Sequence, residues 1–276
     1  MSIFDVTSLQ DLDPKGEEKW LNMKLIDKNI DRIRSAIRRK TDPSVKINRS
    51  KVASLVLGLI DKASFRVGSA GAETFGVSTI KRKHIQFENG KAIFDYVGKK
   101  GVRQLKTISD PYYVGLLKQM VEFSKSNDCD QLFCYQTPNG KIAGVTDNNV
   151  RDELKELTGI RKVHAFRARK ANEIIINTVL KNQQQGYRDA LQDVVSELGH
   201  YRRNLIGQMV LEKKGSTAEK SYIHPDVKLL KYRSGGYKRY GDVSRNEGKK
   251  MSRKSIIRSI RDGNIKKSSR RMFFDE

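Results

Sequence analysis

The first forty residues carry an apolar stripe with helical spacing. Its members, three and four apart, are Met23, Ile26, Ile30, Ile33 and Ile37. This spacing places apolar side chains on one face of a helix, and we predict a single helix from Gly16 to Lys40. The opposite face is basic, and we interpret it either as a solvated surface or as a surface that contacts phosphates. Its residues are Lys24, Lys28, Arg32, Arg38 and Arg39.

A second apolar pattern predicts a buried helix followed by a small sheet. Residues 46–63 have helical spacing, and the buried face holds Val52, Leu55, Val56, Leu59 and Ile60. Between Phe75 and Ser109 the pattern changes to short runs rich in β-formers, at residues 76–80, 84–87, 93–97 and 102–108. Asn89-Gly90 stands between two of these runs and is a strong signal for a two-residue hairpin. We therefore predict an antiparallel sheet.

The remaining apolar pattern is mainly helical. Asp110-Pro111 has the form of a cap followed by proline, which predicts a helix to about Ser126. A short segment at 132–135 and a turn at 137–140 follow, and further helices are predicted at 147–157, 164–181 and 186–198. The predicted fold class is α+β, a mostly helical domain with a small antiparallel β-sheet.

Composition adds a strong positive charge to this picture. The 276 residues include 55 Lys and Arg against 32 Asp and Glu, a formal charge of +23, which indicates a polyanionic partner. Residues 228–276 hold 16 basic residues against 5 acidic ones and too few apolar residues for a core of their own. We predict a basic C-terminal extension there, with a short helix near 255–261.

Other features narrow the class of protein. No apolar run approaches the roughly 18 to 20 residues that span a membrane, and Met1–Glu18 has five acidic residues and no hydrophobic block, unlike a secretory signal. Cys129 and Cys134 fit a reducing compartment and lack further ligands at metal-binding spacing. We expect no metal and no membrane partner, and a location in the cytoplasm, or in the nucleus of a eukaryotic host.

The stretch 198–227 contains a histidine and a tyrosine suited to phosphate chemistry. It begins Leu198-Gly199-His200 and ends Ser221-Tyr222-Ile223-His224-Pro225-Asp226-Val227. A phenol is a weak nucleophile at neutral pH because its ordinary pKa is about 10, so a nucleophilic Tyr222 needs a cationic pocket. Candidates for that pocket are Arg66, Lys99 and Arg167. Each also has an ordinary explanation as a helix-end charge or a turn residue.

The stretch from about Ala63 to Val227 resembles the catalytic domain of type IB DNA topoisomerases. The resemblance rests on Phe65-Arg66-Val67-Gly68, on residues 75–85, on Phe94-Asp95-Tyr96-Val97-Gly98-Lys99 and on the segments around His200 and Tyr222. It implies the DNA breaking-rejoining enzyme fold, and it implies roles for five residues. Tyr222 would be the nucleophile and Lys99 the general acid. The residues around the scissile phosphate would be Arg66, Arg167 and His200. Guanidinium groups match the charge of such a phosphate, and a lysine of lowered pKa can protonate a leaving alkoxide.

The resemblance also implies a reaction and a partner. The reaction would be ATP-independent relaxation of supercoiled duplex DNA through a single-strand nick, a 3′-phosphotyrosyl intermediate and religation, by a monomer on double-stranded DNA. The sequence has no Gly-x-x-x-x-Gly-Lys-Ser/Thr loop and no evident acidic cluster for magnesium, which agrees with a reaction that uses no nucleotide or other cofactor. The residues expected to contact DNA are Lys24, Lys28, Arg32, Lys81, Lys83, Arg169, Arg202, Arg203 and Lys220.

Several features depart from the family pattern. His164 stands where these topoisomerases usually have a lysine, and His-x-x-Arg is the pattern of tyrosine recombinases, so His164 is either a second proton donor or a histidine at a helix start. Residues 201–214 lengthen the separation of His200 and Tyr222, and we predict a small inserted, linker-like helix there. Glu219 replaces a lysine three residues before Tyr222. We expect a clamp around DNA that is either partial or built from 20–40 and the tail beyond Lys228.

We thus predict three parts: an arm with a basic helix at 1–45, a topoisomerase-like catalytic domain at 46–227 and a basic extension at 228–276. The leading hypothesis is a type IB topoisomerase whose compact form fits a virus or phage, and which would then be located with the viral or phage DNA. One alternative is a tyrosine recombinase, an integrase or a hairpin telomere resolvase, which would share the covalent intermediate. The other is an architectural protein that binds DNA without cutting it.

Overall fold

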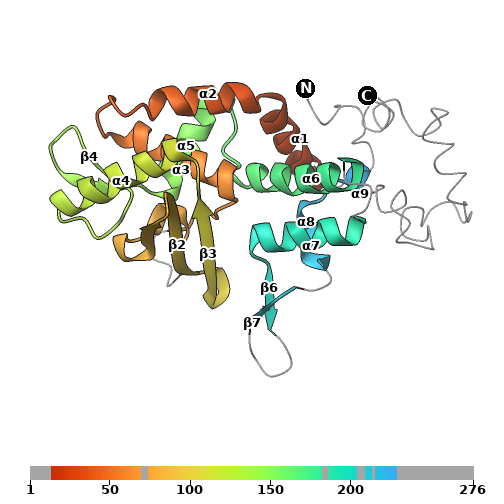
Figure 1. Cartoon of the computed structure of the whole chain (residues 1–276). Helices are drawn as coiled ribbons and strands as arrows, with labels where there is room; N and C mark the ends of the chain where they lie inside the picture. The colour runs from red at the N-terminus through yellow and green to blue at the C-terminus, as the bar shows by residue number, and fades with distance from the viewer. Residues whose placement is uncertain (1–13, 70–73, 182–185, 204–208, 213–214, 229–276) are drawn as a thin grey trace, which may run out of the picture. The chain divides into compact units, whose positions relative to one another are not determined.

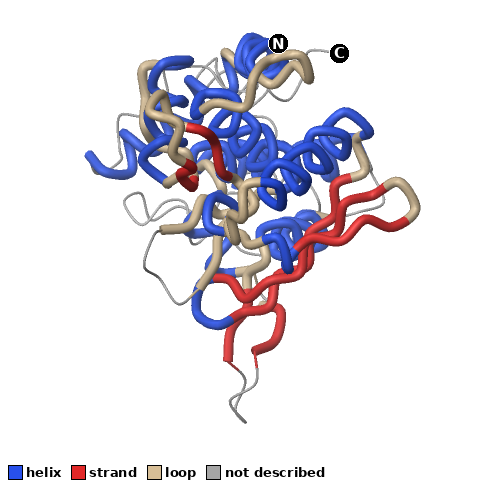
Figure 2. The backbone as a smooth tube through the Cα atoms, turned by 90° about the vertical axis from the view of Figure 1, so that its left-hand side faces the viewer, coloured by secondary structure: helices blue, strands red, loops and turns tan. Residues whose placement is uncertain are grey.

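The computed structural model describes residues 14–69, 74–181, 186–203, 209–212 and 215–228. Helices predominate over a few short strands (Figure 1), which Figure 2 draws in red among the blue helices, so the predicted α+β class is confirmed. The chain forms two compact units. We call residues 29–167 the pocket unit, and the described parts of 1–28 and 168–276 the tyrosine unit. The three predicted parts remain a prediction, and the N-terminal arm at 1–13 and the basic extension beyond Lys228 lie outside the described residues.

The N-terminal apolar stripe is divided between the two units. Helix α1 covers Pro14–Lys28 and helix α2 covers Ile30–Lys40, with Asn29 between them at φ −107° and ψ 11°. Met23 on α1 belongs to the core of the tyrosine unit, whereas Ile33 on α2 is buried in the pocket unit. The prediction of a single helix over 16–40 is wrong, because one periodic stripe serves two separate cores.

A three-stranded antiparallel sheet lies in the pocket unit. Its strands are β1 (Ile85–Glu88), β2 (Lys91–Gly98) and β3 (Val102–Ile108), in the order β1-β2-β3. Asn89 and Gly90 form the predicted two-residue turn, and both have positive φ. Residues Val77–Thr79, predicted as part of a strand, form a 3₁₀ turn instead. The N–H groups of Val77 and Ser78 bond to the 66–67 backbone and so are not available for strand pairing.

Helices pack against this sheet within the pocket unit. The predicted helices at 111–126 and 147–157 are confirmed as α4 (Pro111–Ser126) and α5 (Asp147–Thr158), with a hairpin of β4 (Cys134–Gln136) and β5 (Ile142–Gly144) between them. Helix α3 (Arg49–Ala63) contacts α2, α4, α5 and β3, and is buried on almost every side. The buried carboxylate of Glu153 joins α2, α3 and α5 by accepting hydrogen bonds from Lys40 Nζ (2.7 Å) and Ser54 Oγ (2.8 Å).

The tyrosine unit packs its helices around one apolar core. It contains α1 and the part of α6 (His164–Lys181) from Ala168 onward. It also contains α7 (Tyr187–Leu198), α8 (Ser216–Tyr222) and α9 (Pro225–Lys228). The helices predicted at 164–181 and 186–198 are confirmed. Core residues include Trp20, Met23, Ala171, Ile175, Val194, Leu198, Ala218, Tyr222 and Ile223.

The segment between His200 and Tyr222 begins with a β-hairpin. Strands β6 (Tyr201–Arg203) and β7 (Met209–Leu211) pair in antiparallel fashion, with Tyr201 opposite Leu211. The inserted helix predicted for 201–214 is therefore wrong, because strands of three residues are too short to leave a period of two in the sequence. Within the described residues, no helix has the length and apolar character needed to cross a membrane.

Candidate active site

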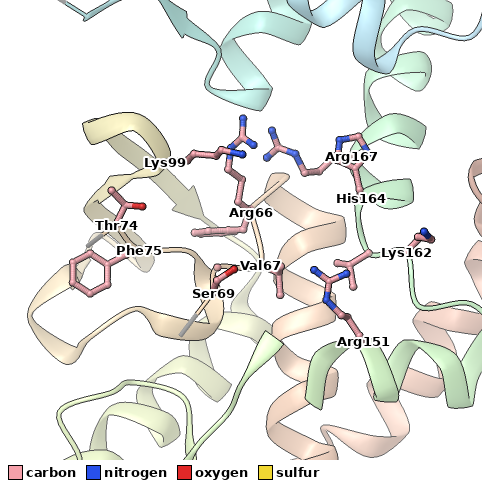
Figure 3. Close-up of a pocket in the computed structure, with 13 residues that line it drawn as sticks. Arg66, Val67, Ser69, Thr74, Phe75, Lys99, Arg151, Lys162, His164 and Arg167 are labelled. Carbon is pink, nitrogen blue, oxygen red and sulfur yellow. The ribbon is translucent and has the colours of Figure 1, made fainter. Parts of the chain in front are cut away.

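A pocket of about 400 Å³ in the pocket unit brings together four of the predicted site residues. Arg66, Lys99, His164 and Arg167 all line it, and they come from the loop after α3, the turn between β2 and β3, and the start of α6. In Figure 3 the nitrogen-bearing ends of Arg66, Lys99 and Arg167 point toward the same space. Two cations that the sequence did not single out, Arg151 and Lys162, also line the pocket. The arrangement suits an anion with several negatively charged oxygens.

Backbone hydrogen bonds fix the loop that carries Arg66. The N–H of Val77 donates to the carbonyl of Arg66 (2.8 Å), and Ser78 donates twice to the next carbonyl, from its N–H (2.8 Å) and its Oγ (2.6 Å). Gly68 has φ 94°, and a Cβ on the facing Gly76 would collide with its backbone. Glycine is therefore required where these two backbones meet. The 3₁₀ turn that replaces the predicted strand holds Arg66 in the pocket.

Arg167 is held by the end of α3. Its side chain is only 4% exposed, and Nη1 donates a hydrogen bond to the carbonyl of Ser64. Ser64 is the residue that ends α3, with φ 52° in the left-handed region. One helix end therefore positions both arginines, since the chain turns at Ser64 and reaches Arg66 two residues later. The sequence did not indicate Ser64, because its partner lies 103 residues away.

Tyr96 on β2 lies near both arginines without neutralising them. Burial raises the pKa of its phenol above the ordinary value, and the positive charges of Arg167 and Arg66 oppose that rise only in part. Its ring stacks with Phe65 at 6.2 Å between centroids. Because the phenol stays neutral at physiological pH, the pocket keeps its positive charge for a ligand.

Lys99 and His164 are both exposed at the pocket, as are Ser69 and Lys162. Lys99 begins the 3₁₀ turn Lys99–Gly101 between β2 and β3, in which Lys100 and Gly101 have positive φ. His164 is the first residue of α6. Exposed groups at a pocket can reach the leaving oxygen of a bound substrate. The choice between a second proton donor and a helix-start histidine for His164 remains a prediction.

Tyr222 and His200 lie together in the tyrosine unit. Their ring centroids are 5.1 Å apart, with 55° between the ring planes, and the residues are 4% and 6% exposed. His200 follows Gly199, which ends α7 with φ 60°. The carbonyl of His200 accepts a hydrogen bond from the N–H of Glu212 (3.0 Å). The structure thus brings the predicted nucleophile beside the predicted histidine.

Glu212 supports the start of the helix that ends in Tyr222. Its Oε1 accepts hydrogen bonds from Ser216 Oγ (2.6 Å) and from the N–H of Thr217 (3.0 Å), both in the first turn of α8. Burial raises the pKa of Glu212, but these hydrogen bonds and the nearby His200 bring it below its ordinary value overall. The carboxylate is therefore ionised at neutral pH, as suits the positive end of a helix dipole.

The residues predicted to contact DNA differ widely in exposure. Lys28, Arg32, Lys83 and Lys220 are exposed. Lys81 is partly exposed and pairs with Asp130 (2.5 Å). Lys24 and Arg169 are 4% and 5% exposed, and Arg169 Nε is 2.9 Å from Asp27 Oδ1. The backbone of Arg202 and Arg203 belongs to β6, but their side chains lie outside the described residues.

Burial therefore separates Lys24 and Arg169 from the exposed cations, and we leave these two out of the DNA-contacting surface that we propose.

The described residues contain no group of three or more His, Cys, Asp and Glu side chains that would hold a metal ion. Cys134 is buried and Cys129 is half-buried, and both are free thiols.

Comparison with known proteins identifies related chains. The family model described as "Eukaryotic DNA topoisomerase I, catalytic core" matches residues 13–220. This range contains Arg66, Lys99, Arg167 and His200, and it ends two residues before Tyr222. A protein of Acanthamoeba polyphaga mimivirus named DNA topoisomerase 1B is 24% identical over 220 residues, which are 76% of this chain and 63% of the relative. The chain thus spans less than two thirds of that relative's length.

Proposed function

The chain belongs to the family of eukaryotic DNA topoisomerase I catalytic cores, and we propose on that basis that it relaxes supercoiled duplex DNA. The observation that carries the proposal is that Arg66, Lys99 and Arg167 line the same pocket, although they come from three distant parts of the chain. The formal charge of +23 provides the attraction to the DNA backbone. Such binding weakens steeply as salt rises, because counterions are released on binding.

In the proposed reaction the Tyr222 phenol loses its proton to water and its oxygen attacks a DNA phosphodiester. A bond forms between that oxygen and phosphorus while the bond to the 5′ oxygen breaks, which leaves a 3′-phosphotyrosyl adduct and a free 5′ end. Arg66 and Arg167 stabilise the negative charge that builds on the non-bridging oxygens, with about 3 kcal/mol from each well-placed donor. His200, beside the Tyr222 ring, would complete this set on the phosphate.

Protonation of the departing 5′ oxygen completes the cleavage step. Lys99 is the proposed donor because it is a cation exposed at the pocket, where a leaving group can reach it. The adduct keeps the bond energy of the cleaved strand, so attack by the 5′ hydroxyl reseals the DNA without a nucleotide. Rotation of the free end before resealing removes supercoils.

The decisive experiment is transfer of label from DNA to protein. Uniformly ³²P-labelled plasmid is mixed with the protein in EDTA without ATP, stopped with detergent, digested with nuclease and run on a denaturing gel. We expect labelled wild-type protein, relaxed plasmid in a parallel sample, and neither product with Tyr222→Phe. Tyr201→Phe makes the same chemical change at an exposed tyrosine and should behave as wild type. Equal DNA binding by wild type and Tyr222→Phe, with no relaxation by either, would instead favour an architectural protein.

A recombinase is the second candidate because His164 and Arg167 line the pocket with the His-x-x-Arg spacing. A recombinase would form the same covalent intermediate, but it would exchange strands between two duplexes. Incubation with two duplexes of different length that share a mapped cleavage site separates the two functions. A topoisomerase returns the parental strands, whereas a recombinase gives strands of new length, and a hairpin resolvase gives closed ends.

A further inference from the structure

We propose that Asn172 is a positioning residue that fixes the backbone immediately after Tyr222; the inference rests on the proposed function. Asn172 lies on α6 in the tyrosine unit and is completely buried. Its Nδ2 donates to the carbonyl of Tyr222 (2.7 Å), and its Oδ1 accepts from the N–H of His224 (2.7 Å). One side-chain amide thus holds the two peptide groups that flank Ile223.

The two hydrogen bonds from Asn172 act where the chain leaves helix α8. Tyr222 is the last residue of α8, and Ile223 is extended (φ −93°, ψ 125°). The last carbonyls of a helix have no partner within the helix, so the direction of the chain depends on an outside group. Asn172 supplies both a donor and an acceptor, which Leu, Ala and ionised Asp cannot do. With Glu212 at its start, α8 is held at both ends.

Asn172 is itself fixed by neighbouring groups. Nδ2 also donates to the carbonyl of Ala168 one turn earlier on α6 (2.6 Å) and lies 3.3 Å from Met23 Sδ on α1. His224, whose N–H bonds to Asn172, is buried, and its ring packs edge-to-face with Trp20 at 5.2 Å between ring centroids. The two peptide groups that follow Tyr222 are therefore set by α6 and α1 rather than by α8 alone.

This arrangement predicts a defect in the rate of attack and not in DNA binding. Attack needs the phenol oxygen in line with the scissile bond, and a displacement of about 1 Å can cost on the order of 100-fold in rate. Asn172→Asp keeps the shape of the side chain but places a carboxylate oxygen against the Tyr222 carbonyl. Asn172→Leu keeps a similar volume and removes both hydrogen bonds. Neither change alters Arg66, Lys99 or Arg167.

The experiment compares these variants with Ile175→Ala under saturating DNA. Ile175 lies on the same helix, in the same core, and is completely buried, but no hydrogen bond joins it to the Tyr222 segment among those of the described residues. We expect both Asn172 variants to form the covalent adduct about 100-fold more slowly than wild type, with DNA affinity within about twofold. Ile175→Ala should lower the thermal midpoint and keep the wild-type rate at temperatures where it is folded.

A sulfur leaving atom adds a second readout. A duplex with 5′ sulfur at the mapped cleavage site needs no proton donor, so it should restore the rate of Lys99→Ala but not that of Asn172→Asp. If wild type forms no adduct, the proposed function fails and the inference fails with it. If wild type forms the adduct, three results would overturn the inference alone: an Asn172 variant within threefold of wild type, rescue of Asn172→Asp by sulfur, or an equal loss in Ile175→Ala. Should Asn172→Asp not fold, Asn172→Leu decides by the same criteria.

Discussion

The pocket unit and the tyrosine unit hold their proposed reactive groups by different means. In the pocket unit, Arg66 and Lys99 reach the solvent from a loop and a turn, and backbone hydrogen bonds fix the Arg66 loop. In the tyrosine unit, Tyr222 and His200 are almost fully buried against an apolar core. Arg167, which is buried in the pocket unit, is the exception. The proposed phosphate-binding groups are thus held mainly by loop and turn geometry, whereas the proposed nucleophile is held by packing against the core.

Removal of Arg167 should have the largest effect on the pocket unit. Arg167→Ala takes one guanidinium from the proposed transition state, and we expect covalent adduct formation to slow on the order of 10³-fold. DNA affinity should change less than about threefold, since many other cations contribute to backbone binding. Label transfer measures the rate, and filter binding measures the affinity.

Arg161→Ala is the matched control for this experiment. Arg161 belongs to the same unit, pairs with Asp152 at the surface (3.1 Å) and is not one of the residues that line the pocket. Removal of the Arg161 side chain should leave the rate of covalent adduct formation unchanged. A loss of DNA affinity in Arg167→Ala that equals the loss of rate would contradict the separation between binding charge and transition-state charge.

A smaller effect is expected from the exposed edge of the pocket. Lys99→Ala should slow cleavage about 100-fold by removing the proton donor, and sulfur at the 5′ position should return the rate to within about tenfold of wild type. Lys100→Ala changes the next residue of the same turn, which does not line the pocket. If Lys100→Ala were equally slow, or if sulfur failed to rescue Lys99→Ala, the general-acid role would be wrong.

The smallest expected effect concerns stability in the tyrosine unit. Burial, together with the charges of Lys24, Lys228 and Lys19, lowers the pKa of His224 to about 3, whereas an unfolded histidine has a pKa near 6.5. The unfolded chain therefore binds more protons between these values, and stability is lost as the pH falls from about 6.5 toward 3. The slope from this one group is at most about 1.4 kcal/mol per pH unit.

His224→Phe should remove that contribution while it keeps a ring beside Trp20. Urea unfolding at pH 7, 6 and 5 measures the slope in wild type and variant. We expect the wild-type unfolding free energy to fall more steeply with acid than that of His224→Phe. Equal slopes would show that His224 takes up its proton as readily in the folded protein as in the unfolded chain.

Local sequence signals predicted the elements whose geometry depends on neighbouring residues. Asn89-Gly90 gave a turn with positive φ, and Asp110 caps α4 before Pro111 by accepting from the Tyr112 N–H (3.1 Å). The break at Asn29 was not predictable in this way, because the apolar stripe is regular on both sides of it. Only the division of that stripe between two cores accounts for it.

The candidate site was predictable in its charged residues but not in their supports. Arg66, Lys99 and Arg167 form a recognisable set, and the structure places them in one pocket. Ser64 and Asn172 carry no such signal, since a serine after a helix and an asparagine within one are ordinary residues. Their roles arise from partners 103 and 50 residues away, which no local pattern records.

The burial of Tyr222 would limit unwanted cleavage if this residue is the nucleophile that we propose. A tyrosine that is only 4% exposed would not reach a phosphate during a brief encounter with DNA, so accidental nicks would be rare. Cleavage would then require a duplex that stays bound until the phenol oxygen becomes accessible. Fidelity of this kind comes from delayed access and needs no recognition of bases.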